Sequence, residues 1–88
     1  MMNTVEIMEC ADDAALVRAL EAGHGWIVGL TRQPDGALED AMVVRNAASG
    51  FLAVFRVGDV DRIARGLPSN VAGAMRDAAA RIRTEIAE

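Results

Sequence analysis

The hydrophobic pattern of the chain is densest between residues 26 and 57, where three apolar runs are separated by two turns. The runs cover residues 26–32, 41–45 and 51–57, and they are rich in Val, Leu, Ile and Phe, as β-strands are. Residues 33–36 (QPDG) and 46–50 (NAASG) supply the Pro, Asn, Asp and Gly that tight turns favour. The pattern predicts a three-stranded antiparallel meander.

The chain before the meander predicts one strand and one helix. Residues 3–9 alternate apolar and polar side chains, which is typical of a short strand, although an irregular terminal arm is the alternative. The Asp12-Asp13 pair indicates a helix start, because a carboxylate can accept hydrogen bonds from the free N–H groups there. We expect this helix to run to Ala22, with leucines at i,i+4 spacing on its inner face and Gly23 as a left-handed cap.

The chain after the meander predicts two more helices. A short helix is expected from Asp59 to Arg65, and a long one from Ser69 or Asn70 almost to the end. The long helix has an apolar stripe of five residues at helical spacing: Val71, Met75, Ala78, Ile82 and Ile86.

These elements predict the fold class. We expect a single α+β domain over residues 1–88, built as a two-layer sandwich. Its three- to four-stranded antiparallel sheet, of order (β)-α-β-β-β-α-α, would carry the helices on one face.

The hairpin of the second and third predicted strands is apolar on both faces, whereas a sheet with one wet face should alternate. A turn over residues 46–50 would pair Arg45 with Phe51 and Val43 with Ala53. We expect this hairpin to show one apolar face to a second copy of the chain, giving a homodimer, or to a larger target protein. The alternative is that the short helix or the N-terminal strand of the same chain covers that face. The predicted interface consists of Met42, Val44, Leu52 and Val54.

Charge narrows the range of partners. The net charge is −4: residues 1–40 hold eight acids and two arginines, and residues 41–88 hold five acids and seven arginines. An acidic chain is a poor general nucleic-acid binder. The sequence lacks a signal peptide pattern and any apolar run of about 20 residues, so we expect a cytoplasmic protein with no membrane partner. All nine basic residues are arginine, a bias typical of GC-rich genomes and therefore of a small bacterial or phage-like protein.

Candidate chemistry is sparse. His24 is the single histidine and Cys10 the single cysteine, and the acidic pairs are explained by helix starts or a loop. We therefore expect no catalytic residue, no metal site and no cofactor. Arg76 and Arg83 lie seven residues apart on one helix face that could meet an acidic partner or a phosphate, although a solvated face is the simpler interpretation.

The order of helix, three strands and helix resembles the double-stranded-RNA-binding domain. Such domains carry a basic cluster where the last helix begins, whereas residues 68–72 here read PSNVA. The order is also similar to that of small acidic dimeric secretion chaperones, a similarity of topology and charge without a shared motif.

The sequence thus predicts a small acidic, non-enzymatic protein–protein interaction module: an adaptor, chaperone or inhibitor of a larger assembly. The alternative is a ligand-binding or enzymatic domain with a pocket between sheet and helices near Trp26 and His24.

Overall fold

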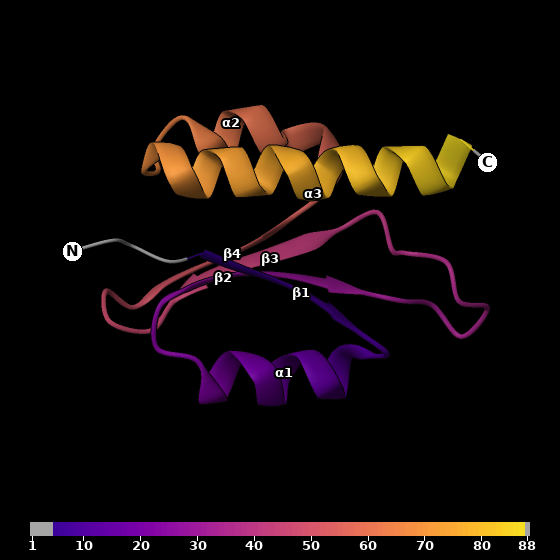
Figure 1. Ribbon diagram of the computed structural model, residues 1–88, viewed down its shortest axis with the longest axis horizontal. Coiled ribbons are helices and arrows are strands. Elements are labelled where there is room, and N and C mark those ends of the chain that lie inside the picture. The colour runs from indigo at the N-terminus through magenta and orange to yellow at the C-terminus, as the bar shows by residue number, and fades with distance from the viewer. Residues whose placement is uncertain (1–4, 88) are drawn as a thin grey trace.

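A four-stranded sheet lies between helices on both sides in the computed structural model, which describes residues 5–87 (Figure 1). The predicted strand at residues 3–9 therefore begins outside the described residues. The element order β-α-β-β-β-α-α and the α+β class are confirmed. The elements are β1 Val5–Cys10, α1 Asp13–Ala22, β2 Trp26–Thr31, β3 Met42–Asn46, β4 Phe51–Phe55, a 3-10 turn η1 Val57–Asp59, α2 Val60–Ala64 and α3 Ser69–Ala87.

The sheet has the order β1-β2-β3-β4 and is mixed, which corrects the expected all-antiparallel sheet. β1 runs parallel to β2, while β2–β3 and β3–β4 are antiparallel. Parallel neighbours cannot be joined by a tight turn, so the chain must cross over one face of the sheet between them. That crossover contains α1.

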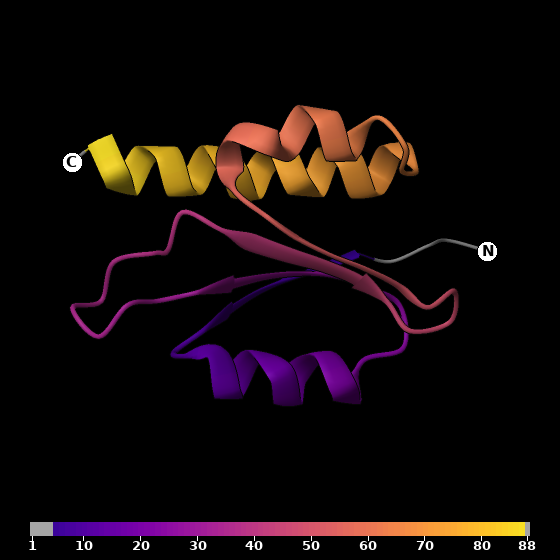
Figure 2. The ribbon, with the colours of Figure 1, turned by 180° about the vertical axis from the view of Figure 1, so that it is seen from behind.

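The crossover also corrects the expected two-layer arrangement with helices on one face. α1 lies on one side of the sheet, and α2 and α3 lie on the other (Figures 1 and 2). The side chains divide accordingly into two clusters. The larger one, between the sheet and α3, includes Val28, Leu30, Met42, Val44, Met75 and Ile82. The smaller one, beneath α1, consists of Leu16, Leu20 and Ile27.

Local sequence explains how α1 begins and ends. The carboxylate of Asp12 accepts a hydrogen bond from the Ala15 N–H at 2.8 Å, so the predicted N-cap is confirmed. The predicted left-handed cap is wrong, because Gly23 has φ −86°. The backbone at Gly23 instead lies close to Ile27, whose terminal methyl group would have to shift to make room for a Cβ at this position.

The long helix α3 buries most of its predicted stripe. Val71, Met75, Ala78 and Ile82 are fully buried. The exception is Ile86, in the last turn of the helix, which is 60% exposed.

Candidate protein-binding face

The register between β3 and β4 decides which apolar side chains are free to meet a partner. Asn46 pairs with Phe51, Val44 with Ala53 and Met42 with Phe55. The expected pairing of Arg45 with Phe51 is therefore wrong by one residue. The loop has four residues rather than five, because Asn46 belongs to the strand: its carbonyl accepts from the Gly50 N–H and its side chain from the Ser49 N–H.

A shift of one residue turns every side chain of a strand to the opposite face of the sheet. Met42 and Val44 consequently lie in the core beneath α3, with 1% and 0% of their surfaces exposed. Leu52 and Val54 point to the other face and are 60% and 69% exposed. The four residues of the predicted interface therefore do not share one face; the structure brings Leu52 and Val54 together and separates Met42 and Val44 from them.

The face that carries Leu52 and Val54 is only partly covered by α1. The helix packs on β1 and β2, where Gly29 lies directly beneath it: a Cβ at that position would collide with the side chain of Leu16. On β3, the guanidinium of Arg45 donates a hydrogen bond to the carbonyl of Leu20 in the last turn of α1. A cation there also complements the negative end of the helix dipole. β4 extends beyond the cover that α1 provides.

The uncovered strip is a groove of about 390 Å³, which we call the α1–β4 groove. Its apolar lining residues come from α1 and from β3 and β4, and its lining also includes Thr31 and Glu39. Thr31 donates a hydrogen bond from its hydroxyl to the carboxylate of Glu39 at 2.8 Å. The residues lining the groove include Asp13, Leu16, Val17, Leu20, Gly29, Thr31, Glu39, Ala41, Val43, Leu52 and Val54.

A second hollow lies at the other border of α1, where the helix ends and the chain turns into β2. It has a volume of about 370 Å³ and is lined by Glu6, Met8, Ala19, Ala22, Gly23, His24, Gly25, Trp26 and Ile27. His24 is exposed. The ring of Trp26 packs against the ring of Phe51 on the α3 side, with centroids 5.5 Å apart, so Trp26 contributes to the core as well.

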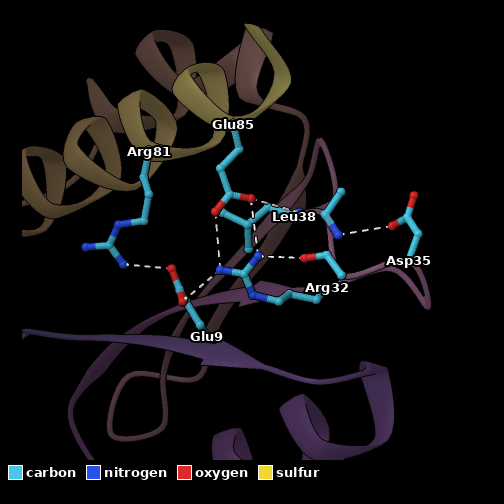
Figure 3. Close-up of polar contacts among 8 residues, drawn as sticks. Glu9, Arg32, Asp35, Leu38, Arg81 and Glu85 are labelled. Atoms are coloured by element: carbon cyan, nitrogen blue, oxygen red, sulfur yellow. Dashed lines mark hydrogen bonds and ion pairs between the residues drawn. The ribbon is translucent and has the colours of Figure 1, made fainter. Parts of the chain in front are cut away.

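A cluster of ion pairs closes the end of the molecule where β1 and β2 finish (Figure 3). We call it the Arg32 cluster; its members are Glu9, Arg32, Arg81 and Glu85. The guanidinium of Arg32 lies 3.2 Å from carboxylate oxygens of both Glu9 and Glu85, and Arg81 lies 3.0 Å from Glu9. Hydrogen bonds from Arg81 and Arg32 lower the pKa of Glu9 below its usual value of 4.5. The hydrogen bonds that Arg32 donates to Glu85, and to a smaller extent to Glu9, raise the pKa of Arg32.

The Arg32 cluster also fixes the long loop between β2 and β3. Arg32 donates to the carbonyl of Gly36 at 2.7 Å, and Glu85 accepts the backbone N–H of Leu38 at 3.2 Å. Leu38 is thereby held in the core, only 3% exposed. Sequence reasoning missed this cluster, because its partners are 23 to 72 residues apart and no local spacing signals them.

The arginines predicted to meet a partner lie on the exposed side of α3. Arg76 pairs with Asp61 of α2 at 3.2 Å, which joins the two helices. Arg83 is also exposed and lies seven residues, or about two helical turns, after Arg76 in α3. The structure places both far from the α1–β4 groove, on the opposite side of the sheet (Figures 1 and 2).

Other kinds of site find no support in the described part of the chain. Within residues 5–87, His, Cys, Asp and Glu side chains do not gather in a group of three that could hold a metal ion. Cys10 ends β1 as a half-buried free thiol and packs against the cluster beneath α1. None of the helices in this range has the length and apolar character needed to cross a membrane.

Comparisons of the chain with protein-family models, with curated proteins and with solved structures found no match.

Proposed function

We propose that the chain is a non-enzymatic protein–protein interaction module that binds a polypeptide along the α1–β4 groove. One observation carries the proposal. Four large hydrophobic side chains are exposed among the residues whose surfaces are described, and three of them, Val17, Leu52 and Val54, line this one groove.

Physical chemistry favours a polypeptide as the occupant. Scattered single hydrophobic residues are normal on a protein surface, whereas a contiguous apolar strip indicates an interaction site. The strip also runs beside β4, a strand at the end of the sheet order, and such a strand can accept a further strand through its backbone. The module would act by association, as an adaptor, a chaperone or an inhibitor of a larger assembly, and its partners include a second copy of itself.

The proposal is tested by comparing binding of the wild-type chain with binding of Leu52→Glu and Val54→Glu. Partners recovered from the host by the tagged wild type are identified, purified and titrated against each variant. A purified partner should bind the wild type and lose at least tenfold in affinity with either acid, since burying an unpaired carboxylate is costly. The control is Ile86→Glu, because Ile86 is as exposed as Leu52 but lies in the last turn of α3. A partner that binds all four proteins equally, together with unaltered self-association, would contradict the proposal.

A second candidate function rests on the hollow beside His24. A ligand-binding or enzymatic domain would use this space, which combines the imidazole of His24 and the carboxylate of Glu6 with an apolar floor that includes Met8 and Ile27. A thermal-shift screen with metabolites and nucleotides distinguishes the two candidates. A large shift that disappears in His24→Ala and persists in Leu52→Glu would favour the second.

A further inference from the structure

The sequence of β4 has a symmetry that singles out one partner for the α1–β4 groove. The strand reads Phe51-Leu52-Ala53-Val54-Phe55, which is nearly the same in both directions about Ala53. Phenylalanines stand at the two ends, branched aliphatic residues come next, and the smallest side chain is at the centre. An antiparallel pair formed by two copies of such a strand would match large groups with large groups and small with small.

The strand is also free to pair. In the sheet order β1-β2-β3-β4, β4 has β3 on one side and no neighbouring strand among residues 5–87 on the other. Proteins usually protect such edges with charged residues, proline or a β-bulge. β4 contains no charged residue and no proline, and its pairing with β3 is regular over all five residues. The opposite edge, β1, carries Glu6 and Glu9.

We propose that β4 pairs antiparallel with β4 of a second copy, around a two-fold axis through Ala53, so that the two sheets join into one of eight strands. This inference rests on the proposed function and names the partner of the same surface. The register places Leu52 opposite Val54 of the partner subunit and Phe51 opposite Phe55 of the partner subunit. Ala53 meets its own copy on the axis.

The geometry of the two faces supports this mode. A two-fold axis normal to the sheet does not exchange the two faces of the sheet. The α1–β4 grooves of both copies therefore open on the same face of the joined sheet. Leu52 and Val54 of both copies then form one apolar cluster between two α1 helices. This cluster covers the side chains that are 60% and 69% exposed in the single chain. Because each contact occurs twice, a single substitution removes two contacts from the interface.

Light scattering coupled to gel filtration tests the inference. The wild type should have twice the mass of the 9.3 kDa chain at micromolar concentration, and Ile86→Glu should have the same mass as the wild type. Leu52→Glu and Val54→Glu should each have the mass of a single chain. In a dimer of either variant, the two-fold axis would bring like charges together in a desolvated cluster. Far-ultraviolet circular dichroism checks that each variant is folded.

Disulfide formation tests the register, in a Cys10→Ser background. A mixture of Leu52→Cys and Val54→Cys chains should be linked mainly as a mixed pair, because directly opposite Cα atoms lie about 4.5–5.5 Å apart in an antiparallel pair, within disulfide range. Either variant alone should be linked much less, since its two cysteines are diagonal neighbours at roughly 7–8 Å. Trypsin cuts after Arg45 and Arg56, so residues 46–56 are released as one peptide and the three possible disulfides differ in mass. Ile86→Cys serves as the control for random oxidation of an exposed position, because Ile86 is 60% exposed and lies in α3, outside the α1–β4 groove.

The outcomes separate this inference from the proposed function. A wild type of 9.3 kDa overturns β4 self-pairing, as does a dimer that survives both acidic variants or links Leu52→Cys to itself as readily as to Val54→Cys. If self-pairing fails but a purified partner still loses affinity with Leu52→Glu, the proposed function stands with a different occupant. If an acidic variant does not fold, the disulfide pattern decides, because cysteine is neutral and apolar.

Discussion

The guanidinium of Arg81 lies 3.0 Å from the carboxylate of Glu9, although 72 residues separate them in the chain. Arg32 approaches the same carboxylate at 3.2 Å, so Glu9 accepts from two arginines (Figure 3). Through Glu85 the same cluster reaches the backbone of the loop at Leu38. The first strand, the long loop and the last helix are therefore tied together at one end of the molecule.

The lowered pKa of Glu9 predicts an acid-sensitive contribution to stability. The carboxylate has its usual pKa of 4.5 in the unfolded chain and a lower one in the folded chain. Its contribution is thus fully present above pH 4.5 and is lost as the pH falls through the folded value, because the unfolded chain binds the proton more tightly.

Glu9→Gln should accordingly flatten the dependence of unfolding free energy on pH below 4.5. Urea titrations at several pH values measure this, and Glu6→Gln, on the same strand but outside the Arg32 cluster, is the control. Parallel curves for the wild type and Glu9→Gln would show that the ion pairs do not act in solution.

Arg32→Gln should lower the thermal midpoint more than Arg62→Gln. Arg32 bridges two carboxylates and the Gly36 carbonyl, whereas Arg62 is an exposed partner of Asp59 at 3.8 Å on the same short stretch of chain. Isolated surface pairs contribute little, and networks contribute more. Hydrogen exchange should also become faster at the amide of Leu38. Equal midpoints for the two variants would contradict the network.

The β3–β4 register predicts opposite outcomes for neighbouring hydrophobic residues. Met42→Ala should lose about 2–5 kcal/mol of unfolding free energy, because it opens a cavity in the core. Leu52→Ala, at an exposed position, should lose about 0.5 kcal/mol or less in the monomer. Urea unfolding at a single low protein concentration is the measurement, since association would add stability. A larger loss of unfolding free energy for Leu52→Ala than for Met42→Ala would contradict the β3–β4 register.

Two glycines predict effects of opposite sign. Gly29→Ala should destabilise the chain by about 1–3 kcal/mol, because its new Cβ meets Leu16 where α1 packs on the sheet. Gly73→Ala should stabilise by about 0.5–1 kcal/mol, because Gly73 is exposed within α3 and a Cβ there meets nothing within 4 Å. Thermal unfolding of the two variants beside the wild type measures both. A gain with Gly29→Ala would mean that α1 does not pack closely at this point.

The sequence by itself determined the elements and their order. The turn residues at positions 33–36 and 46–50, the Asp12 cap and the stripe of α3 are signals that act over a few residues. Such signals persist in an isolated segment because they depend on backbone geometry and local hydrogen bonds. They also indicated that both faces of the β3–β4 hairpin carry apolar side chains, of which Leu52 and Val54 are exposed in the single chain.

Only the tertiary structure decided which element covers which face. Whether β1 pairs parallel or antiparallel with β2 depends on how the chain crosses the sheet through α1. The hydrophobic periodicity of the sequence does not specify that path. The register of β4 depended on whether Asn46 ends a strand or begins a turn, and this one residue transferred Met42 and Val44 from the predicted interface into the core. The Arg32 cluster and the α1–β4 groove likewise bring together side chains from distant segments. Local sequence cannot specify such contacts, because they exist only once the whole chain has folded.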